Sequence, residues 1–248
     1  MSSTDFEIRL AEEFGTLAIY EEYFFIVQNG KERKLRLHDY AEIYRIPGLY
    51  AYLASEIRYQ SPDVLSSLLM EQVTQAGNRV EDLVVLEIGA GSGLFGKAIA
   101  KIGVKSITGV DISLEAAAAA EREYPGIYEN YYAEDLTNLS EMARQQLTSK
   151  GFNCLVCCSA LGGSHISAKA FTTALNAITS NGLIVFNFSQ DAWDKDNKGK
   201  GAGELIQLHP WITETNILEI LATRPYQHRI YMDGRSIEHI AIIARKRC

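Results

Sequence analysis

The sequence predicts an α/β fold in which a mostly parallel β-sheet is covered by helices on both faces. From about residue 83 onward, short apolar runs alternate with helical segments, which is the pattern of repeated β-α-β units. The 248 residues are enough to bury one substantial core, and open α/β sheets of this length commonly form one domain. We therefore expect a single sheet-based domain with an appended segment.

Five apolar runs predict the strands of this sheet, and helical segments lie between them. The expected strands are residues 83–89, 106–111, 127–132, 152–158 and 182–188. The expected helices are residues 93–102, 113–124, 138–150 and 166–179. We expect the last helix to begin after Ser164, a suitable N-cap residue, and to stop at Asn181–Gly182.

A long polar segment follows the fifth strand. Residues 189–203 are polar and rich in glycine, so they predict a loop, and loops of this length often serve as lids or binding loops. A helix is expected near residues 213–223. Asp233–Gly234 then stands between two β-rich runs, which predicts a hairpin turn. The sheet is therefore expected to end in an antiparallel pair of strands.

The beginning of the chain differs in character, and we expect residues 1–60 to form an extension to a main domain of residues 61–248. Asn29–Gly30 predicts a small hairpin within the extension. A helical stretch rich in tyrosine follows this hairpin. Ser61, followed by proline and aspartate, predicts the N-cap of the next helix.

Composition and charge exclude several classes of function. The formal net charge of −7 argues against a nucleic-acid partner, because such binding draws its affinity from clustered Lys and Arg. The basic run at residues 245–247 is expected to be a solvated tail. No apolar stretch approaches the roughly 20 residues that span a bilayer, and the N-terminal residues are polar and acidic. We therefore expect a cytoplasmic protein that does not bind membranes.

The cysteines include a C-x-x-C spacing, yet they do not predict a metal site. Cys154, Cys157 and Cys158 fall inside an apolar run, and a second Cys or His pair at zinc spacing is absent from the sequence. Cys248 stands alone at the C-terminus. We expect buried thiols on a core strand and no metal.

The chemistry is carried by an apolar strand that runs into a glycine-rich turn and then into a helix. The turn spans residues 89–93, where bare backbone can bend tightly and approach a ligand. About twenty residues later a second strand ends in Asp111, whose carboxylate can accept hydrogen bonds from ribose hydroxyls. A nucleotide-like ligand is therefore the expected occupant.

The turn by itself does not identify the ligand, because residues 91–96 also satisfy the G-x-G-x-x-G pattern of dinucleotide-binding enzymes. Three features favour a ligand with an ammonium and a sulfonium. Glu87 places a carboxylate near the turn, where it is a poor neighbour for a pyrophosphate. Asp135 follows the third strand, where it can accept from an adenine amino group. The terminal hairpin replaces a regular parallel continuation of the sheet.

At these residues the chain resembles the class I methyltransferases that depend on S-adenosylmethionine (SAM). The resemblance rests on E-x-G-x-G-x-G at residues 87–93, on Asp111 in VDIS and on Asp135–Leu136, and it covers roughly residues 62–246. It implies a Rossmann-like three-layer sandwich whose seven-stranded sheet has the order 3-2-1-4-5-7-6, with the last strand antiparallel. SAM would be the cofactor and S-adenosylhomocysteine (SAH) the product.

The resemblance also implies which residues hold the cofactor. Glycines of the turn would line the methionine and ribose portions, Asp111 would hold the ribose, Ile112 would pack on the adenine, and Asp135 with Leu136 would meet the adenine edge. The residues expected to bind SAM are Glu87, Gly89, Ala90, Gly91, Gly93, Asp111, Ile112, Glu134, Asp135, Leu136, Cys158, Ser159 and Tyr50. The fourth strand begins with Phe152–Asn153 where the family often has Asp, which weakens any acid-base role there.

The acceptor is expected to be a small molecule, bound between the turn, the tyrosine-rich segment and the 189–203 loop. Its expected contacts are Tyr40, Tyr44, Tyr59, His165 and Trp193. His165 follows the fourth strand, where it is placed either to act as a general base or to bond locally at a helix start. Trp193 either closes over the substrate or packs the loop down. His209, His228 and His239 are scattered, which favours surface or core roles.

Two other functions stay open from the sequence. One is an NAD(P)-dependent oxidoreductase of the Rossmann type, which only the G-x-G-x-x-G overlap supports. The other is a protein that keeps the methyltransferase fold as a catalytically silent binding module. The oligomeric state, the acceptor and its attacking atom are not encoded in any pattern of the chain.

Overall fold

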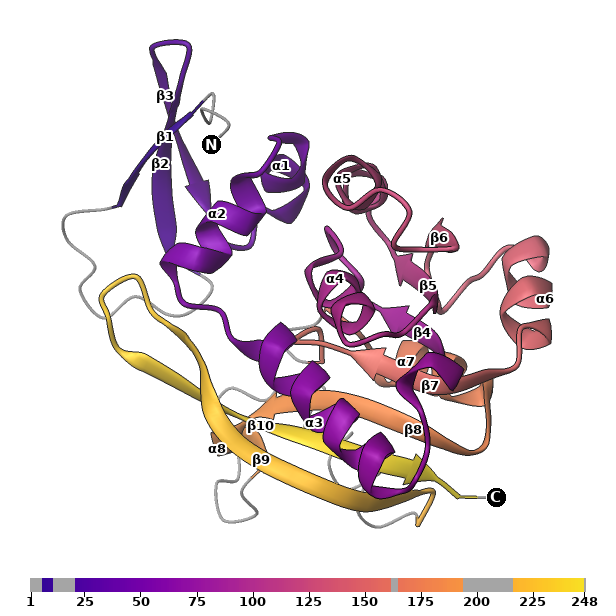
Figure 1. Ribbon diagram of the computed structural model, residues 1–248. Coiled ribbons are helices and arrows are strands. Elements are labelled where there is room, and N and C mark those ends of the chain that lie inside the picture. Colours follow the sequence, from indigo (N-terminus) through magenta and orange to yellow (C-terminus); the bar gives the residue numbers. More distant parts are fainter. Residues whose placement is uncertain (1–5, 11–20, 162–164, 194–215, 248) are drawn as a thin grey trace.

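The largest element of the protein is a seven-stranded sheet with the strand order β6-β5-β4-β7-β8-β10-β9 (Figure 1). The computed structural model describes residues 6–10, 21–161, 165–193 and 216–247. The strands are β4 (Val84–Ile88), β5 (Ser106–Asp111), β6 (Asn130–Ala133), β7 (Phe152–Cys157), β8 (Ile178–Ser189), β9 (Leu218–Ile230) and β10 (Ser236–Lys246). β4 to β8 pair in parallel, whereas β10 is antiparallel to both β8 and β9. The predicted strand order and its antiparallel last strand are confirmed.

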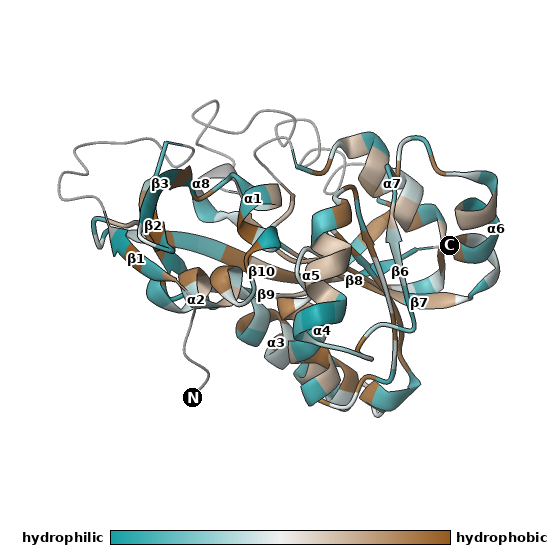
Figure 2. Ribbon diagram, turned by 90° about the horizontal axis from the view of Figure 1, so that it is seen from above, coloured by the Kyte–Doolittle hydropathy of each residue, from teal (hydrophilic) through white to brown (hydrophobic). Residues whose placement is uncertain are grey.

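Helices cover both faces of this sheet. α3 (Ser61–Gln75) and α4 (Leu94–Lys101) contribute side chains to the core on one face. α6 (Glu141–Ser149) and α7 (Ala168–Asn176) contribute to the core on the other face. Figure 2 shows hydrophobic residues of the central strands lying between these helices. The arrangement is the three-layer sandwich that the sequence predicts.

A smaller unit precedes this sandwich. It contains β1 (Glu7–Leu10), β2 (Tyr23–Gln28), β3 (Lys31–Arg36), α1 (Tyr40–Arg45) and α2 (Leu49–Glu56). Its strands form a separate antiparallel sheet, and its helices close a core of their own with that sheet. The predicted turn at Asn29–Gly30 joins β2 to β3, and both residues have positive φ (54° and 72°), as a type I′ turn requires.

The N-terminal unit is attached to the sandwich through α5 (Leu114–Glu123), which lies beside α1 in Figure 1. A guanidinium nitrogen of Arg122 donates to the carbonyl oxygen of Tyr44 at 2.8 Å. Arg45 forms an ion pair with Glu115 at 2.6 Å between nitrogen and oxygen. These contacts hold α1 next to the carboxyl ends of β4 and β5.

The helix expected near residues 213–223 is wrong, because the chain from Leu218 onward is the long strand β9. β9 pairs with β10 along most of its length and forms the edge of the sheet. Pro225 lies within it, and proline is tolerated at a sheet edge but breaks a helix interior. The hairpin that Asp233–Gly234 predicts is confirmed, although its first strand is longer than the sequence suggests.

The helix expected over residues 166–179 is shorter, ending at Asn176. Its N-cap is Ser167, whose hydroxyl accepts from the backbone N–H of Ala170, whereas Ser164 lies outside the described residues. Asn181–Gly182 does not stop the helix but lies within β8, next to an irregularity in the pairing with β7. Glycine is needed there because a Cβ on Gly182 would be 2.4 Å from Ile178.

Ser61 is not an N-cap. It is the first residue of α3, and the capping position is Gln60. The hydroxyl of Ser61 is buried and bonds to side chains of β9 instead. Of the 189–203 loop, residues 190–193 form the short helix α8, and residues from 194 onward lie outside the described part of the chain.

The cysteines lie where the apolar run places them. Cys154 and Cys157 are buried in β7 as free thiols, and Cys248 lies outside the described residues. Over the described ranges, no group of three or more His, Cys, Asp or Glu side chains could hold a metal ion. The absence of a metal from the reaction stays a prediction. None of the helices in those ranges is long and apolar enough to cross a membrane.

Candidate active site

A cavity of about 800 Å³ lies at the carboxyl ends of the parallel strands, which is where open α/β sheets bind ligands. Several parts of the chain line it, including the segment before α7 with His165 and Ile166. The strand ends contribute Gly89, Asp111, Ile112, Glu134, Asp135, Leu136, Cys158 and Ser159. The N-terminal unit and the segment after it contribute His38, Tyr40, Tyr44, Tyr50 and Tyr59. The β9–β10 hairpin contributes His228, Arg229, Tyr231, Ile237 and His239.

The glycine turn after β4 is bent so that only glycine fits. Gly89, Gly91 and Gly93 all have positive φ, at 63°, 55° and 89°. A Cβ on Gly89 would be 2.6 Å from the Cβ of Ala160. Of the three glycines, Gly89 lines the cavity, whereas Gly93 is at the N-cap position of α4. Ala90 is buried and its amide nitrogen donates to the carbonyl oxygen of Val110.

Asp111 is joined to the glycine turn. One carboxylate oxygen accepts from the backbone N–H of Gly91 and the other from that of Ser113, both at 2.9 Å. The hydroxyl of Tyr131 donates to the carbonyl oxygen of Gly91 at 2.7 Å. These bonds fix the carboxylate at the cavity wall while each of its oxygens keeps a further lone pair for a ligand.

Glu87 is located differently from the sequence prediction. It is 1% exposed, it is not among the cavity-lining residues, and it accepts a hydrogen bond from the hydroxyl of Tyr128 at 2.9 Å. Side chains alternate along a strand, and this alternation turns Glu87 toward the core that contains α4. Burial raises the pKa of Glu87 to about 8, although the Tyr128 bond opposes the rise. The expected contact of this carboxylate with a ligand has no geometric support.

The acidic and apolar residues after β5 and β6 lie together at one end of the cavity. Ile112 is 73% exposed at its edge, which leaves an apolar side chain available to a ligand. Leu136 is buried in the core and also lines the cavity. The carboxylate of Asp135 accepts from the backbone N–H of Thr137 at 2.7 Å. Glu134 lines the same end.

Tyrosines of α1 and α2 cover the middle of the cavity. The ring centroids of Tyr44 and Tyr50 are 5.2 Å apart, and those of Tyr40 and Tyr44 are 5.9 Å apart. Burial raises the pKa values of Tyr44 and Tyr50, so both keep their phenolic protons. The rings therefore act as neutral aromatic surfaces and hydrogen-bonding groups.

The other end of the cavity is rich in histidine. His228 and His239 stack with ring centroids 3.8 Å apart and planes 4° from parallel. The hydroxyl of Ser61 is 2.7 Å from both Nδ1 of His228 and the hydroxyl of Tyr226. The amide nitrogen of Asn187 is 2.9 Å from the hydroxyl of Tyr226 and from Nδ1 of His239. A buried polar network thus anchors both imidazoles.

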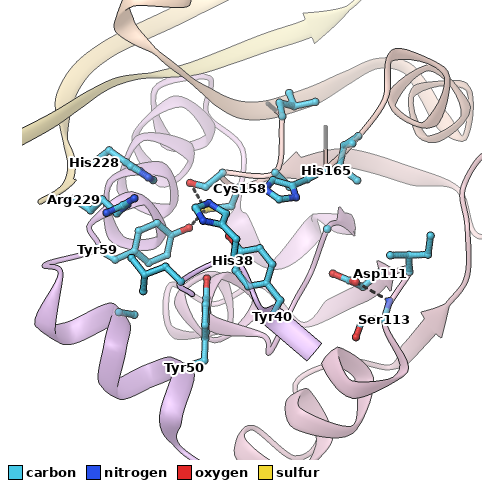
Figure 3. Close-up of a pocket in the computed structure, with 18 of the residues that line it drawn as sticks. His38, Tyr40, Tyr50, Tyr59, Asp111, Ser113, Cys158, His165, His228 and Arg229 are labelled. Atoms are coloured by element: carbon cyan, nitrogen blue, oxygen red, sulfur yellow. Dashed lines mark hydrogen bonds between the residues drawn. The ribbon is translucent and has the colours of Figure 1, made fainter. Parts of the chain in front are cut away.

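Burial and nearby positive charge keep these histidines neutral. Burial lowers the pKa of His239 to about 3 and the pKa of His228 well below its ordinary value, and Arg229 lowers both further. Arg229 is itself buried against Glu22, with 2.6 Å between nitrogen and oxygen. In Figure 3, His228 and Arg229 lie at the end of the cavity opposite Asp111.

A second pair of histidines lies between these two ends. His38 stacks on His165, with ring centroids 5.9 Å apart, and both rings meet the edge of Tyr40 (Figure 3). Burial, then His165, lowers the pKa of His38 to about 4. Desolvation lowers the pKa of His165, while the Asp111 carboxylate raises it. His165 is therefore a neutral imidazole in the cavity wall at neutral pH.

The residues that follow β7 lie between the end of the cavity at Asp111 and the end at His228. Cys158 lines the cavity, and its sulfur is 3.5 Å from the hydroxyl of Tyr59. Ser159 has a positive φ of 57°, which is uncommon for a residue other than glycine. Trp193 lies elsewhere: it stacks on Phe188 at 5.7 Å, is not among the cavity-lining residues, and fits the packing alternative.

Sequence reasoning missed His38, Arg229 and the stacked pair, and it wrongly treated the last two histidines as scattered. A signal for that pair was present. His228 and His239 stand on the two β-rich runs that flank Asp233–Gly234, so the predicted hairpin places them on neighbouring strands, although the register pairs His239 with Tyr226. His209 lies outside the described residues.

The strand order, the glycine turn after β4 and the carboxylate at the end of β5 define an α/β enzyme that binds a nucleotide-like cofactor. The methyltransferase domain family matches residues 56–241, which is most of the chain. The chain belongs to this family and is a class I SAM-dependent methyltransferase.

Solved structures with the same fold include several methyltransferases. A SAM-dependent methyltransferase from Clostridium acetobutylicum is 15% identical, with a TM-score of 0.53 over 80% of this chain and 98% of that one. N-methyltransferase NodS from Bradyrhizobium japonicum, in complex with SAH, is 18% identical, with a TM-score of 0.52 over 79% and 97%. A putative RNA methyltransferase from Pyrococcus horikoshii is 14% identical, with a TM-score of 0.52 over 77% and 88%. Comparison with curated protein sequences gives no significant match.

Proposed function

We propose that this methyltransferase transfers the methyl group of SAM to an oxygen or nitrogen atom of a small molecule. One observation carries the proposal: a single cavity has two chemically different ends. The end at Gly89 and Asp111 has bare backbone and a carboxylate, and the end at His228 and Arg229 has imidazole and guanidinium groups. Tyrosines of the N-terminal unit lie across it, which leaves a chamber suited to a small acceptor.

The residues of the first end fit SAM. Gly89 lines the cavity and has no side chain, so a ligand can approach its backbone closely. Asp111 would accept from the ribose hydroxyls, and the exposed Ile112 would pack against the adenine. Asp135 would meet the adenine edge. We assign Cys158 and Ser159 to the methionine portion because they follow β7, the strand next to β4.

The chemistry required of the chain itself is modest. SAM, when bound, supplies an electrophilic methyl group on a sulfonium, so holding the nucleophile in line gives much of the acceleration. Tyr40, Tyr44 and Tyr50 would exclude water and orient the acceptor. His165 would accept a proton from acceptors that must lose one, because it is neutral and faces the cavity.

We propose that residues 21–60 serve as the cover of this cavity and that residues from 61 onward carry the cofactor. The cover supports a small acceptor over a macromolecule, because Tyr40, Tyr44 and Tyr50 of α1 and α2 form part of the wall of a cavity of about 800 Å³. The net charge of −7 also disfavours RNA. The likeness to a putative RNA methyltransferase concerns the fold.

The proposal is tested by offering the purified chain methyl-labelled SAM together with a metabolite extract, total RNA or total protein. We expect label in the small-molecule fraction. Label confined to RNA or protein would overturn the assignment of the acceptor class. SAH binding measured by calorimetry, without transfer to any of the three pools, would favour the catalytically silent alternative.

A further inference from the structure

We propose that His228 and His239 form a two-donor subsite that recognises an unprotonated oxygen of the methyl acceptor, either a carbonyl or a carboxylate oxygen. This inference rests on the proposed function, because it assigns the histidine end of the cavity to the acceptor. It is carried by the hydrogen bonds behind the two rings, which determine where each imidazole holds its proton.

One hydrogen bond behind the two rings has a fixed direction, because its donor is a backbone N–H. The backbone N–H of Ser159 donates to Oδ1 of Asn187 at 2.7 Å, which fixes the orientation of the Asn187 amide. The amide nitrogen then faces Nδ1 of His239 at 2.9 Å. An amide nitrogen donates and does not accept, so Nδ1 of His239 must be the acceptor. A neutral His239 therefore carries its proton on Nε2.

A second series of hydrogen bonds leads from Asn187 to His228. The amide nitrogen of Asn187 has two protons, and the hydroxyl of Tyr226 at 2.9 Å is closer to it than the hydroxyl of Ser159 at 3.1 Å, so the second proton is assigned to Tyr226. The proton of Tyr226 is then left for the hydroxyl of Ser61 at 2.7 Å, and the proton of Ser61 for Nδ1 of His228 at 2.7 Å. His228 is therefore also an Nε2–H tautomer. Both assignments follow from one backbone N–H.

The two Nε2–H groups are left for the cavity. Within the described residues no hydrogen bond reaches Nε2 of either ring, while both residues line the cavity. The rings stack nearly parallel, and both Nδ1 atoms face the network around Tyr226, so both Nε2 atoms point away from that network. The low pKa values of both histidines keep them neutral, which means that they bind by donating and cannot accept a proton at Nε2.

The surroundings agree with an oxygen ligand. Tyr59 meets the face of His228, with ring centroids 5.3 Å apart, and Arg229 lines the same end with a guanidinium held by Glu22 (Figure 3). A carbonyl or carboxylate oxygen has two lone pairs that match two N–H donors. An ammonium ligand has only N–H donors, which would face the two imidazole N–H donors and would lie beside a positively charged guanidinium. An ammonium group is therefore disfavoured.

The proton positions are tested by ¹⁵N NMR of the full chain with labelled histidine, saturated with SAH at neutral pH. Single variants His228→Gln and His239→Gln assign the two resonance pairs. We expect both rings to be neutral Nε2–H tautomers. An Nδ1–H tautomer or an imidazolium at either position would overturn the inference without any acceptor being known.

The ligand class is tested on the same sample with benzoate, benzamide and benzylamine, which are matched in size. We expect benzoate and benzamide to shift the Nε2 resonances of both histidines, and benzylamine to leave them unchanged. His239→Phe keeps a flat ring without the donor and should weaken benzoate binding roughly tenfold, whereas His239→Gln keeps an N–H and should stay within about threefold. Equal binding by the phenylalanine variant, no response to benzoate and benzamide, or a preference for benzylamine would defeat the subsite.

Calorimetry with SAH separates this inference from the proposed function. If SAH binds but the tautomers or ligand preference differ from expectation, the subsite is wrong and the methyltransferase assignment of the cavity stands. If SAH fails to bind while the histidine spectra agree with expectation, the proposed function falls and the donor pair remains as an oxygen-binding site. If His239→Phe does not fold, the histidine ¹⁵N spectra of the wild-type protein, with and without the three ligands, still test the subsite.

Discussion

The hydroxyl of Tyr44 lies against the backbone of Gly91, so closely that a Cβ on Gly91 would be 2.7 Å from the tyrosine oxygen. Tyr44 belongs to α1 of the N-terminal unit, and Gly91 belongs to the glycine turn after β4. The carbonyl of Gly91 is bound by Tyr131 and its N–H by Asp111. The N-terminal unit and the glycine turn are thus in direct contact.

Gly91→Ala should therefore loosen the cover as well as strain the turn. The positive φ alone costs about 1 kcal/mol for a residue other than glycine, and the clash with Tyr44 adds to that cost. Gly126→Ala is the matched control, because Gly126 also has positive φ (76°) but no atom within 4 Å of its Cβ position. Thermal unfolding and SAH calorimetry should show a larger loss for Gly91→Ala; equal losses would mean that the Tyr44 contact has no consequence.

Asp111→Ala should weaken SAH binding by about 1.5–3 kcal/mol, which is the usual cost of losing a hydrogen bond to a charged group. The carboxylate faces the cavity and is held by Gly91 and Ser113. Asp82→Ala serves as the control. Asp82 is exposed and lies just before β4, at the end of that strand opposite to the glycine turn. Unchanged SAH affinity in Asp111→Ala would remove the ribose contact from the proposal.

Much of the sheet could be predicted because its signals are local. Apolar runs, the glycine turn and the Asp233–Gly234 hairpin each specify their own short segment, and the family resemblance supplies the strand order. Asp111 could be placed at the cavity because it ends a strand beside the glycine turn. Residues at the tips of adjacent parallel strands necessarily meet at one edge.

The incorrect predictions concern residues whose structure depends on partners that are distant in the sequence. β9 is a strand because its backbone pairs with β10 at the edge of the sheet. Residues 213–223 alone do not indicate this partner, which lies further along the chain. Glu87 points into the core because strand alternation, not proximity to the turn, sets its direction. The imidazoles of His228 and His239 meet only once the hairpin register is followed through a bulge beside Ile237.

Glu87 should make stability fall as pH rises. Its pKa is raised from 4.5 to about 8 in the folded protein, so between these values the folded chain holds a proton that the unfolded chain has lost. The stability contribution therefore declines across this window, by on the order of 1.4 kcal/mol for each pH unit. The glutamine in Glu87→Gln cannot ionise. The stability of this variant relative to the wild type should therefore increase as pH rises from about 5 to 8.

The measurement is urea unfolding of both proteins across that pH range, with Glu121→Gln as a control at an exposed position of α5. The difference between Glu87→Gln and the wild type should grow with pH, whereas the control difference should stay flat. A constant difference would show that Glu87 is already ionised in the folded protein at low pH.

The substitutions that residue 61 tolerates show whether Ser61 belongs to a buried hydrogen-bond relay or acts as a helix cap. At a cap, Asp replaces Ser with little loss, because both side chains accept from the first backbone N–H groups. In the relay, the hydroxyl must accept from Tyr226 and donate to His228 in a fully buried position, which a carboxylate cannot do without burying a charge. Ser61→Ala should lower the free energy of unfolding by about 1–3 kcal/mol, and Ser61→Asp by more. Urea denaturation of the two variants, compared with Ser167→Ala and Ser167→Asp at the true N-cap of α7, measures this order; the opposite order at residue 61 would return Ser61 to a capping role.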